Sequence, residues 1–540
     1  MSTFQFLDWV VVGLYFAVLL GIVWWVSRKK QESPDDYFLA GRHVGWLVIG
    51  ASIFASNIGS EHIVGLAGTA AKTGVAMGHY ELHSWLVLML GWVFVPFYMR
   101  SRVFTMPEFL EKRYSSKARW FLSLISLVGY VLTKVSVTVY AGAVVFQTLM
   151  GIDFWSGALI IVILTGIYTV IGGLRAVVYT ETLQTFVLIA GSVTITAIGL
   201  SKIGGWNNLV SIAGIDHLNL FLPADHPDFP WTGMIFAPPI VGLWYWCTDQ
   251  YIVQRTLAAR NETQARRGTI FASFLKLLPF FIFIIPGVIA YALAQTGQMQ
   301  LGEADQAFPA MVRALLPVGL RGLVAGGLLA ALMSSLAAVF NSCSTLFTMD
   351  IYKKLKPDSS EKALVLVGRI ATGVVVVTGI LWIPFMKFIS GELYHYLQSV
   401  QSYIAPPIAA VFLLGIFFKR INSKGAMTAL VGGFAIGMLR LVAELNKGLL
   451  SGVFHTFASI NFLHFCVYLF LVCIAIMVAV SLLTKKPSYE KIKGLTYATT
   501  VAEDKASSRA SWNARDVILS LVVLAIIAIV LIYFSPIGLW

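Results

Sequence analysis

The chain has 540 residues, of which 58% are hydrophobic and 12% are charged, and its formal net charge is +13. Soluble domains carry about a quarter charged residues, so this sequence cannot cover the surfaces of the three or four soluble domains that its length would otherwise suggest. Apolar runs of about 20 residues recur along it, each long enough to cross ~30 Å of hydrocarbon. The composition therefore indicates a polytopic helical membrane protein.

Fourteen apolar segments are long enough to span a membrane, which predicts an all-α fold with 14 transmembrane helices. The first, 7–27, is too long for the core of a signal peptide and has no basic region before it, so we expect a permanent helix. The others are expected at 45–68, 78–98, 118–148, 155–173, 181–202, 231–254, 268–293, 318–352, 363–386, 394–417, 424–443, 460–484 and 514–536.

Lys and Arg are distributed unequally between the loops on the two sides of these segments. Loops that follow odd-numbered segments hold 29 of the 39 basic residues, whereas the opposite loops hold five. Because cytoplasmic loops carry an excess of Lys and Arg, the first set of loops is expected inside and both termini outside. The positive net charge then follows from topology and predicts no nucleic-acid partner.

Polar residues interrupt two apolar segments, at 55–62 and at 238–250. Such stretches are costly in lipid unless unwound backbone lines a site inside the protein. A polar kink packed against its neighbours would explain either one alone, but the two segments lie five apart and therefore run in opposite directions. Inverted repeats that each open with a broken helix are typical of secondary transporters, which bind substrate near the middle of the membrane.

This pattern divides the chain into a first helix, two five-helix repeats and a peripheral C-terminal part. The expected boundaries are 1–44 for the first helix and its inner loop, 45–202 for the first repeat, 203–230 for an outer loop, 231–417 for the second repeat and 418–540 for three peripheral helices, with an inner linker at 485–513.

A few ionisable side chains lie at membrane depth, where such residues usually have a function. Glu81 and Lys276 are the strongest candidates, because an acid and a base that converge on a cavity can hydrogen-bond a neutral polyol without leaving net charge buried. Lys134 is equally consistent with a side chain that extends to the membrane boundary.

Uncharged residues in the same segments suit the same substrate class. The amide of Gln398 can both donate to and accept from sugar hydroxyls, and the rings of Tyr245 and Trp246 can cover the apolar face of a sugar. Alone, each of these residues is more often part of a packed core, so the prediction rests on their joint occurrence.

A small hard cation requires oxygen ligands. The interruption at 55–58 offers backbone carbonyls, and Ser334 and Ser335 offer hydroxyls, although serines in membrane helices more often bond their own backbone. The sequence contains neither a P-loop nor a metal-spaced His/Cys cluster. It therefore predicts transport driven by an ion gradient and no enzyme activity.

Four stretches resemble the sodium/glucose cotransporters of the solute:sodium symporter family, and the resemblance extends over nearly the whole chain. They are FLAGR at 38–42, GASIFASNIGS at 50–60, WYWCTDQYIVQR at 244–255 and NSCSTLFTMDIY at 341–352. The resemblance implies a LeuT-type fold of five plus five inverted helices, with one helix before and three after. The large outer insertions of animal members are absent from this sequence, which favours a bacterial member in the cytoplasmic (inner) membrane.

The resemblance also implies roles for individual residues, position by position. The sugar ligands would be Asn57, His62, Glu81, Lys276 and Gln398, with Tyr245 and Trp246 as the inner ring pair and Leu66, Tyr80 and Tyr394 as an outer gate. The sodium ligands would be the carbonyls of Ala55, Ile58 and Ala331 and the hydroxyls of Ser334 and Ser335, and Glu181 would influence cation coupling.

Three departures from the family pattern bear on specificity and stoichiometry. Gly242 stands where relatives place a polar Asn or Thr, and Leu82-His83 replaces a Trp-Asn or Trp-Met pair, which leaves the preferred hexose open. Ala337-Ala338 follows Ser334-Ser335-Leu336, where members that move two sodium ions carry hydroxyls, so we expect one sodium per sugar.

The resulting hypothesis is a symporter that imports a hexose of the glucose or galactose type with sodium by alternating access. Its partners would be sodium, the sugar and the lipid bilayer, and no obligate protein partner is evident from the sequence. Two alternatives stay open: a sodium symporter for another polyol such as inositol, and a sugar-gated sensor without net sugar transport.

Overall fold

A computed structural model describes residues 4–28, 33–59, 61–382 and 393–538. Within these ranges the regular structure is helical, apart from an isolated bridge between Val44 and Ala259. Eleven of the described helices are long and apolar enough to cross a membrane. The expected all-α polytopic architecture is therefore confirmed. The number of fourteen spans stays a prediction, because breaks divide several of the apolar segments into shorter helices.

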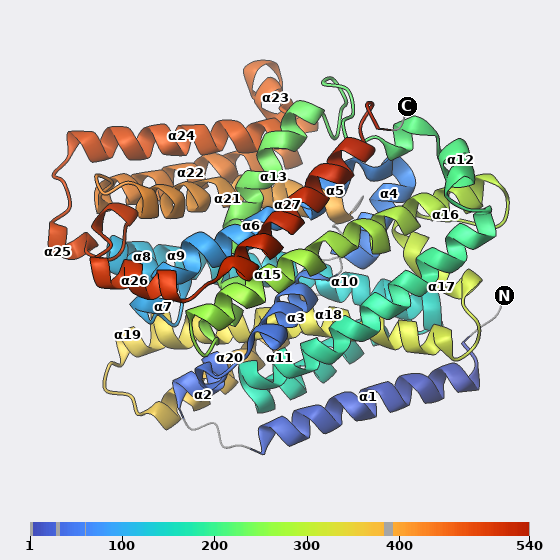
Figure 1. Ribbon diagram of the computed structural model, residues 1–540, viewed down its shortest axis with the longest axis horizontal. Helices are drawn as coiled ribbons and strands as arrows, with labels where there is room; N and C mark the ends of the chain where they lie inside the picture. Colours follow the sequence, from blue (N-terminus) through green and yellow to red (C-terminus); the bar gives the residue numbers. More distant parts are fainter. Residues whose placement is uncertain (1–3, 29–32, 60, 383–392, 539–540) are drawn as a thin grey trace.

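The centre and the edge of the bundle differ sharply in burial. Helix α18 (Leu320–Thr345) runs through the centre, and α1 (Phe6–Ser27) lies along one edge (Figure 1). The most apolar window of the α18 segment is 94% buried, whereas that of α1 is 28% buried. Asp8 fastens α1 to α18, since its carboxylate lies 2.8 Å from the Arg321 guanidinium and accepts the N–H groups of Gly319 and Gly322.

In the first half of the chain, two of the predicted segments are joined into one helix. The predicted helices 155–173 and 181–202 form one element, α11, that bends at Gly173 (φ 54°, ψ −159°). A Cβ atom at Gly173 would lie 2.7 Å from the Tyr37 carbonyl, so glycine also permits the close approach of α2. The helices are α2 (Pro34–Leu39), α3 (Trp46–Asn57), η2 (Glu61–Leu66), α4 (Ala67–Thr73), α5 (Gly78–Leu82), α6 (Ser84–Met89), α7 (Val95–Ser101), α8 (Met106–Arg113), α9 (Ser116–Gly129), α10 (Ser136–Val145) and α11 (Phe154–Ile203).

The second half is built similarly, and here the predicted span 231–254 is divided into two helices. Its elements are α12 (Trp206–Leu218), α13 (Trp231–Cys247), α14 (Gln250–Leu257), α15 (Glu262–Pro279), η7 (Phe280–Ile284), α16 (Ile285–Gln295), α17 (Ala307–Leu315), α18, η9 (Leu346–Tyr352), α20 (Glu361–Trp382) and α21 (Leu393–Phe417). The end of the predicted span 363–386 lies outside the described residues. The division into two inverted repeats stays a prediction.

The C-terminal helices are α22 (Ser423–Leu445), α23 (Gly452–Ser459), α24 (Phe462–Leu483) and α27 (Ala514–Tyr533). Helices α22 and α24 pack with α21 at the upper left of Figure 1, and α27 crosses α15. The predicted linker 485–513 carries the short helices α25 (Tyr489–Ile492) and α26 (Ala502–Ala510). It packs on the bundle because the Tyr497 ring lies 5.2 Å from those of Phe97 and Phe417.

Candidate functional site

The helix that carries the first polar interruption ends in the middle of the protein. Helix α3 stops at Asn57, and Ile58 then takes an extended conformation (φ −76°, ψ 93°) before η2 begins at Glu61. Extended backbone cannot continue the helical hydrogen-bond ladder, so carbonyls near this break accept bonds from other segments. The Ser335 hydroxyl donates to the carbonyls of Ser56 and Ile58, each at 3.2 Å, and the Tyr251 hydroxyl donates to Ser56 at 2.5 Å.

The second interruption falls at the end of the stretch 238–250 that the sequence predicts. Pro238 and Pro239 lie inside α13, which continues to Cys247. The backbone leaves the helix at Thr248 and is extended at Asp249 (φ −79°, ψ 128°), whose carboxylate caps α14. The proline pair is tolerated inside a buried helix, and the break itself occurs at the polar Thr248-Asp249 step.

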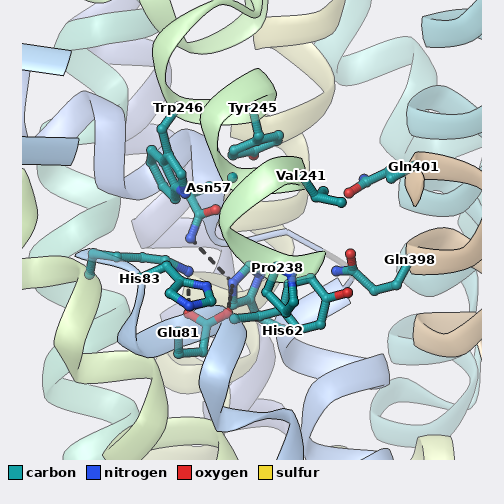
Figure 2. A pocket seen from close by; sticks show the side chains of 13 residues that line it. Asn57, His62, Glu81, His83, Pro238, Val241, Tyr245, Trp246, Gln398 and Gln401 are labelled. Atoms are coloured by element: carbon teal, nitrogen blue, oxygen red, sulfur yellow. Dashed lines mark hydrogen bonds and ion pairs between the residues drawn. The ribbon is translucent and has the colours of Figure 1, made fainter. Parts of the chain in front are cut away.

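A cavity of about 50 Å³ lies between these two breaks (Figure 2). Its walls come from the end of α3, η2, α5, α13, α15 and α21. All of the predicted sugar ligands line it, together with both predicted ring residues and Tyr80. The lining residues are Asn57, His62, Tyr80, Glu81, His83, Pro238, Val241, Gly242, Tyr245, Trp246, Lys276, Gln398 and Gln401.

An acid–base group forms the polar wall of this cavity. The Glu81 carboxylate lies 2.5 Å from the Lys276 ammonium and 3.2 Å from Nε2 of His62, and that nitrogen is also 3.2 Å from the Asn57 amide. All four side chains are buried. An acid and a base at this distance offset each other's charge, so the group can be buried and still offer hydrogen-bonding atoms to a neutral solute.

Three other polar atoms of the cavity residues are buried without a hydrogen-bond partner among the described residues. They are Nδ1 of His62, Nδ1 of His83 and Oε1 of Gln398. Such groups are rare in folded proteins because each one costs the free energy of its lost hydration. The structure therefore brings together a set of donors and acceptors that a hydroxyl-rich solute can satisfy.

The aromatic and outer residues divide into two groups. The rings of Tyr245 and Trp246 meet edge to face at 5.0 Å, and the Lys276 ammonium lies 5.2 Å from the Trp246 ring centroid. Of the predicted outer gate, Tyr80 lines the cavity, whereas Leu66 is fully buried in η2 and does not. The side chain of Tyr394 lies outside the described residues.

Leu86 explains the glycine at position 242. A Cβ atom at Gly242 would lie 2.5 Å from Cδ1 of Leu86, so the space for a polar side chain there is filled by an apolar one. His83, which stands three residues before Leu86 in the turn between α5 and α6, lines the same cavity. The sequence marked His83 as a departure but gave no signal that its ring reaches the cavity.

Ser334 and Ser335 of α18 bond different partners. Ser335 bonds the α3 break, whereas the Ser334 hydroxyl donates to Glu181 at 3.0 Å. Ala55 and Ala331 are buried in α3 and α18, which pack against each other. The structure thus joins Ile58 and Ser335 directly, whereas Ser334 bonds Glu181.

Glu181 belongs to a buried ion pair that the sequence did not predict. Its carboxylate lies 2.8 Å from the Arg255 guanidinium, with neither side chain exposed, and also accepts from Ser52 and Ser56. Arg255, the first basic residue after the predicted span 231–254, lies inside α14 and is buried. Its place in the run 244–255, one of the four stretches that resemble the symporter family, was the available signal.

Lys134 does not extend to the membrane boundary. Its ammonium pairs with the Asp249 carboxylate at 2.7 Å and lies 3.8 Å from the centroid of the Tyr251 ring. Tyr130 donates to the same carboxylate. This cluster holds the Thr248-Asp249 break beside Tyr245, since the Lys134 ammonium lies 4.7 Å from the Tyr245 ring centroid. No sequence spacing could have paired residues 115 positions apart.

Comparison with known proteins identifies the family of the chain. The model of the "Sodium:solute symporter family" matches residues 37–433. The chain belongs to this family. It is therefore a multi-pass membrane protein that couples the movement of a solute to sodium, and its curated relatives are transporters and not enzymes.

Two relatives of similar sequence identity are named as transporters of different solutes. The sheep (Ovis aries) "Sodium/glucose cotransporter 1" is 40% identical over 88% of this chain and 78% of its own length. The human "Sodium/myo-inositol cotransporter 2" is 38% identical over 91% of this chain and 79% of its own length. The two identities are nearly equal, so identity alone does not choose between a hexose and a cyclic polyol.

Solved structures support the fold. The structure of a sodium-coupled sialic acid symporter in a substrate-bound outward-open state superposes with a TM-score of 0.77, at 22% identity, over 90% of this chain and 99% of that one. The symporter Mhp1 in a closed conformation superposes with a TM-score of 0.54 at 14% identity, over 85% of this chain and 98% of that one. The expected LeuT-type architecture is confirmed at the level of the overall fold.

Proposed function

We propose that this symporter imports a hexose of the glucose or galactose type, with one sodium ion per sugar, by alternating access. The observation that carries the proposal is the convergence of Glu81, Lys276, His62, Asn57 and Gln398 on one buried cavity beside the Tyr245–Trp246 ring pair. Charged donors and acceptors bind the hydroxyls of a sugar through charge-assisted hydrogen bonds. Aromatic rings cover the apolar C–H face of the same sugar.

The cavity between these groups is small. A volume of about 50 Å³ admits a few water molecules, so a hexose requires the walls to separate. The walls belong to different helices, and relative movement of packed helices is how transporters of this architecture open a central site to one side at a time. Alternating access by this route is consistent with a site that lies between two helix breaks.

A sodium site adjoins the solute site across the α3 break. We place the ion at the carbonyls of Ala55, Ile58 and Ala331 and at the hydroxyls of Ser334 and Ser335, because Ser335 and the Ile58 carbonyl already lie 3.2 Å apart. Oxygen atoms are the ligands that hard cations require. Sodium there would hold the break that carries Asn57 on one side and His62 on the other.

The second candidate solute is myo-inositol. It is favoured by the departures at Gly242 and His83, which change the donors around the solute. The 38% identity to the human sodium/myo-inositol cotransporter is compatible with it. A cyclic polyol presents hydroxyls of the same chemistry, so the same polar wall would serve it.

Purified protein in proteoliposomes tests the proposal. An inward sodium gradient should drive accumulation of labelled glucose or galactose, whereas a choline gradient should not. Competition by unlabelled myo-inositol stronger than by either hexose would favour the second candidate. Sodium current with no accumulation of any labelled solute would indicate a sugar-gated sensor, and activity of the chain alone tests the prediction that no protein partner is needed.

We further propose a cytoplasmic-membrane location with both termini outside, supported by the 29 basic residues that follow odd-numbered segments. Most of these residues lie in connections and helix ends in the described structure, for example Lys353 and Lys354 in α19 (Lys353–Leu355). A membrane-impermeant reagent that labels a single cysteine placed at Ser488, but only after the cell is permeabilised, would support this orientation.

A further inference from the structure

A second, larger crevice lies away from the solute cavity. It has a volume of about 460 Å³ and opens between the beginning of α3, the first half of α15 and the beginning of α27. Helix α27 crosses α15 in Figure 1. None of the residues that line this crevice lines the solute cavity. The lining residues are Trp46, Arg267, Ile270, Phe271, Phe274, Asn513, Arg515, Asp516 and Leu519.

One rim of the crevice is cationic. The Arg267 guanidinium lies 3.0 Å from the Asp516 carboxylate, which also accepts the Asn513 N–H at 3.0 Å, so the charge of Asp516 is offset within the rim. Arg515 is exposed and has no ion-pair partner among the described residues. A net positive charge therefore stays available at this rim.

The helix directions add to this positive potential. Helices α3 and α27 begin at the crevice, at Trp46 and Ala514. The N-terminal end of a helix carries a partial positive charge, so these two ends favour a negative group between them. The charge distribution of the loops predicts that this side of the protein is cytoplasmic.

The floor of the crevice is apolar and leads toward the middle of the membrane. Along α15, Arg267 is followed by Ile270, Phe271 and Phe274, so the lining changes from charged to apolar within two helical turns. Trp46 is 41% exposed and meets the Phe271 ring edge to face at 5.5 Å. Tryptophan is enriched where membrane meets water, which places the rim at headgroup depth.

We infer that this crevice binds one anionic phospholipid, with its phosphate at Arg515 and Arg267 and an acyl chain over Phe271 and Phe274. Basic pockets between helices on the cytoplasmic side of membrane proteins bind anionic headgroups. The apolar floor distinguishes a lipid from a soluble phosphate, which would use the cationic rim alone. The inference is independent of the solute that the protein carries.

The test compares lipids and a soluble anion on delipidated, detergent-purified protein. Thermal unfolding and native mass spectrometry are followed during titration with phosphatidylglycerol, phosphatidylcholine or inorganic phosphate. We expect phosphatidylglycerol to raise the melting temperature and to saturate one tight site, while phosphatidylcholine binds more weakly at that site. Equal binding of the two lipids, or equal protection by inorganic phosphate, would overturn the inference.

Matched variants locate the site. Arg515→Gln removes the unpaired charge without breaking an ion pair and should weaken phosphatidylglycerol binding about fivefold. The double variant Arg267→Gln/Asp516→Asn removes the neighbouring pair together, which avoids an unpaired buried carboxylate. Lys424→Gln is the control, because Lys424 is an exposed cation at the start of α22 on the same predicted side. If Lys424→Gln weakens binding as much as Arg515→Gln, the crevice is not the binding site.

Discussion

At the scale of single residues, the solute site depends on the Glu81–Lys276 pair. Glu81→Ala removes the carboxylate and leaves the buried Lys276 and His62 without it. A hydrogen bond to a charged group contributes ~1.5–3 kcal/mol, so the affinity for solute should fall roughly tenfold or more and uptake at low solute concentration should be lost. Labelled-solute uptake into proteoliposomes measures this.

The control for the Glu81 variant is Glu490→Gln, since Glu490 is exposed in α25. Lys276→Ala should have an effect similar to that of Glu81→Ala. Half-saturation unchanged in both single variants would show that the solute binds elsewhere.

His83 is the cavity residue that departs most from the family pattern. Its Nδ1 atom is buried without a partner, so a bound hydroxyl would satisfy it. His83→Phe keeps a ring and removes both nitrogens, and we expect the solute affinity to fall about twofold to tenfold, the range of one neutral hydrogen bond. The measurement is binding of several hexoses and myo-inositol, and a uniform, unchanged set of affinities would remove His83 from the site.

Individual residues also show what a sequence can predict. Glu81 and Lys276 could be identified because charged side chains at membrane depth are rare, and rarity makes each one informative. The Lys134–Asp249 and Glu181–Arg255 pairs could not, because the partners are 115 and 74 positions apart and only the folded chain brings them together. The sequence marked Leu82-His83 as a departure that bears on specificity, but it could not show that the His83 ring reaches the cavity from the turn between α5 and α6.

At the scale of elements, the α3 break links the sodium and solute sites. Sodium held at the Ile58 carbonyl and Ser335 would fix the backbone between Asn57 and His62, which contact each other at 3.2 Å. Sodium should therefore raise the affinity for solute, and solute should raise the affinity for sodium by the same factor. Calorimetry or tryptophan fluorescence in sodium and in choline measures both affinities.

Ser335→Ala should weaken both affinities together, because it removes a ligand from one site and a contact of the shared break. The matched control is Ser342→Ala, which lies in the same helix two turns later and bonds Gln254 instead. Solute binding that is identical in sodium and in choline would contradict this coupling.

The positions of the helix breaks depend partly on local sequence and partly on packing. The α3 break lies where polar residues interrupt the apolar run, as predicted. Backbone that leaves a helix at membrane depth loses its helical hydrogen bonds, so it is tolerated only where it is buried in protein or lines a cavity. The second break lies inside the predicted stretch 238–250, at its polar Thr248-Asp249 end and not at the prolines, since a proline pair in a buried helix can be accommodated by neighbouring segments. The stretch 485–513, predicted to be an inner linker, packs on the bundle through Tyr497, a contact that composition does not reveal.

At the scale of the whole molecule, the number of sodium ions sets how far solute can be concentrated. Ala337 and Ala338 are fully buried in α18 and their methyl groups cannot ligate a cation, and Ser334 is bonded to Glu181. Glu181 is itself paired with Arg255, which offsets the charge that would attract a second ion. We therefore predict one sodium per solute molecule.

This stoichiometry has a measurable limit. One sodium crossing 100 mV releases ~2.3 kcal/mol, and a tenfold concentration gradient adds ~1.4 kcal/mol, which together support roughly 500-fold accumulation of solute. Two ions would square that limit to the order of 10⁵-fold. The reversal potential in proteoliposomes with set sodium and solute gradients distinguishes the two cases. A shift that matches two sodium ions per solute would show that the Glu181–Arg255 region or another site admits a second cation.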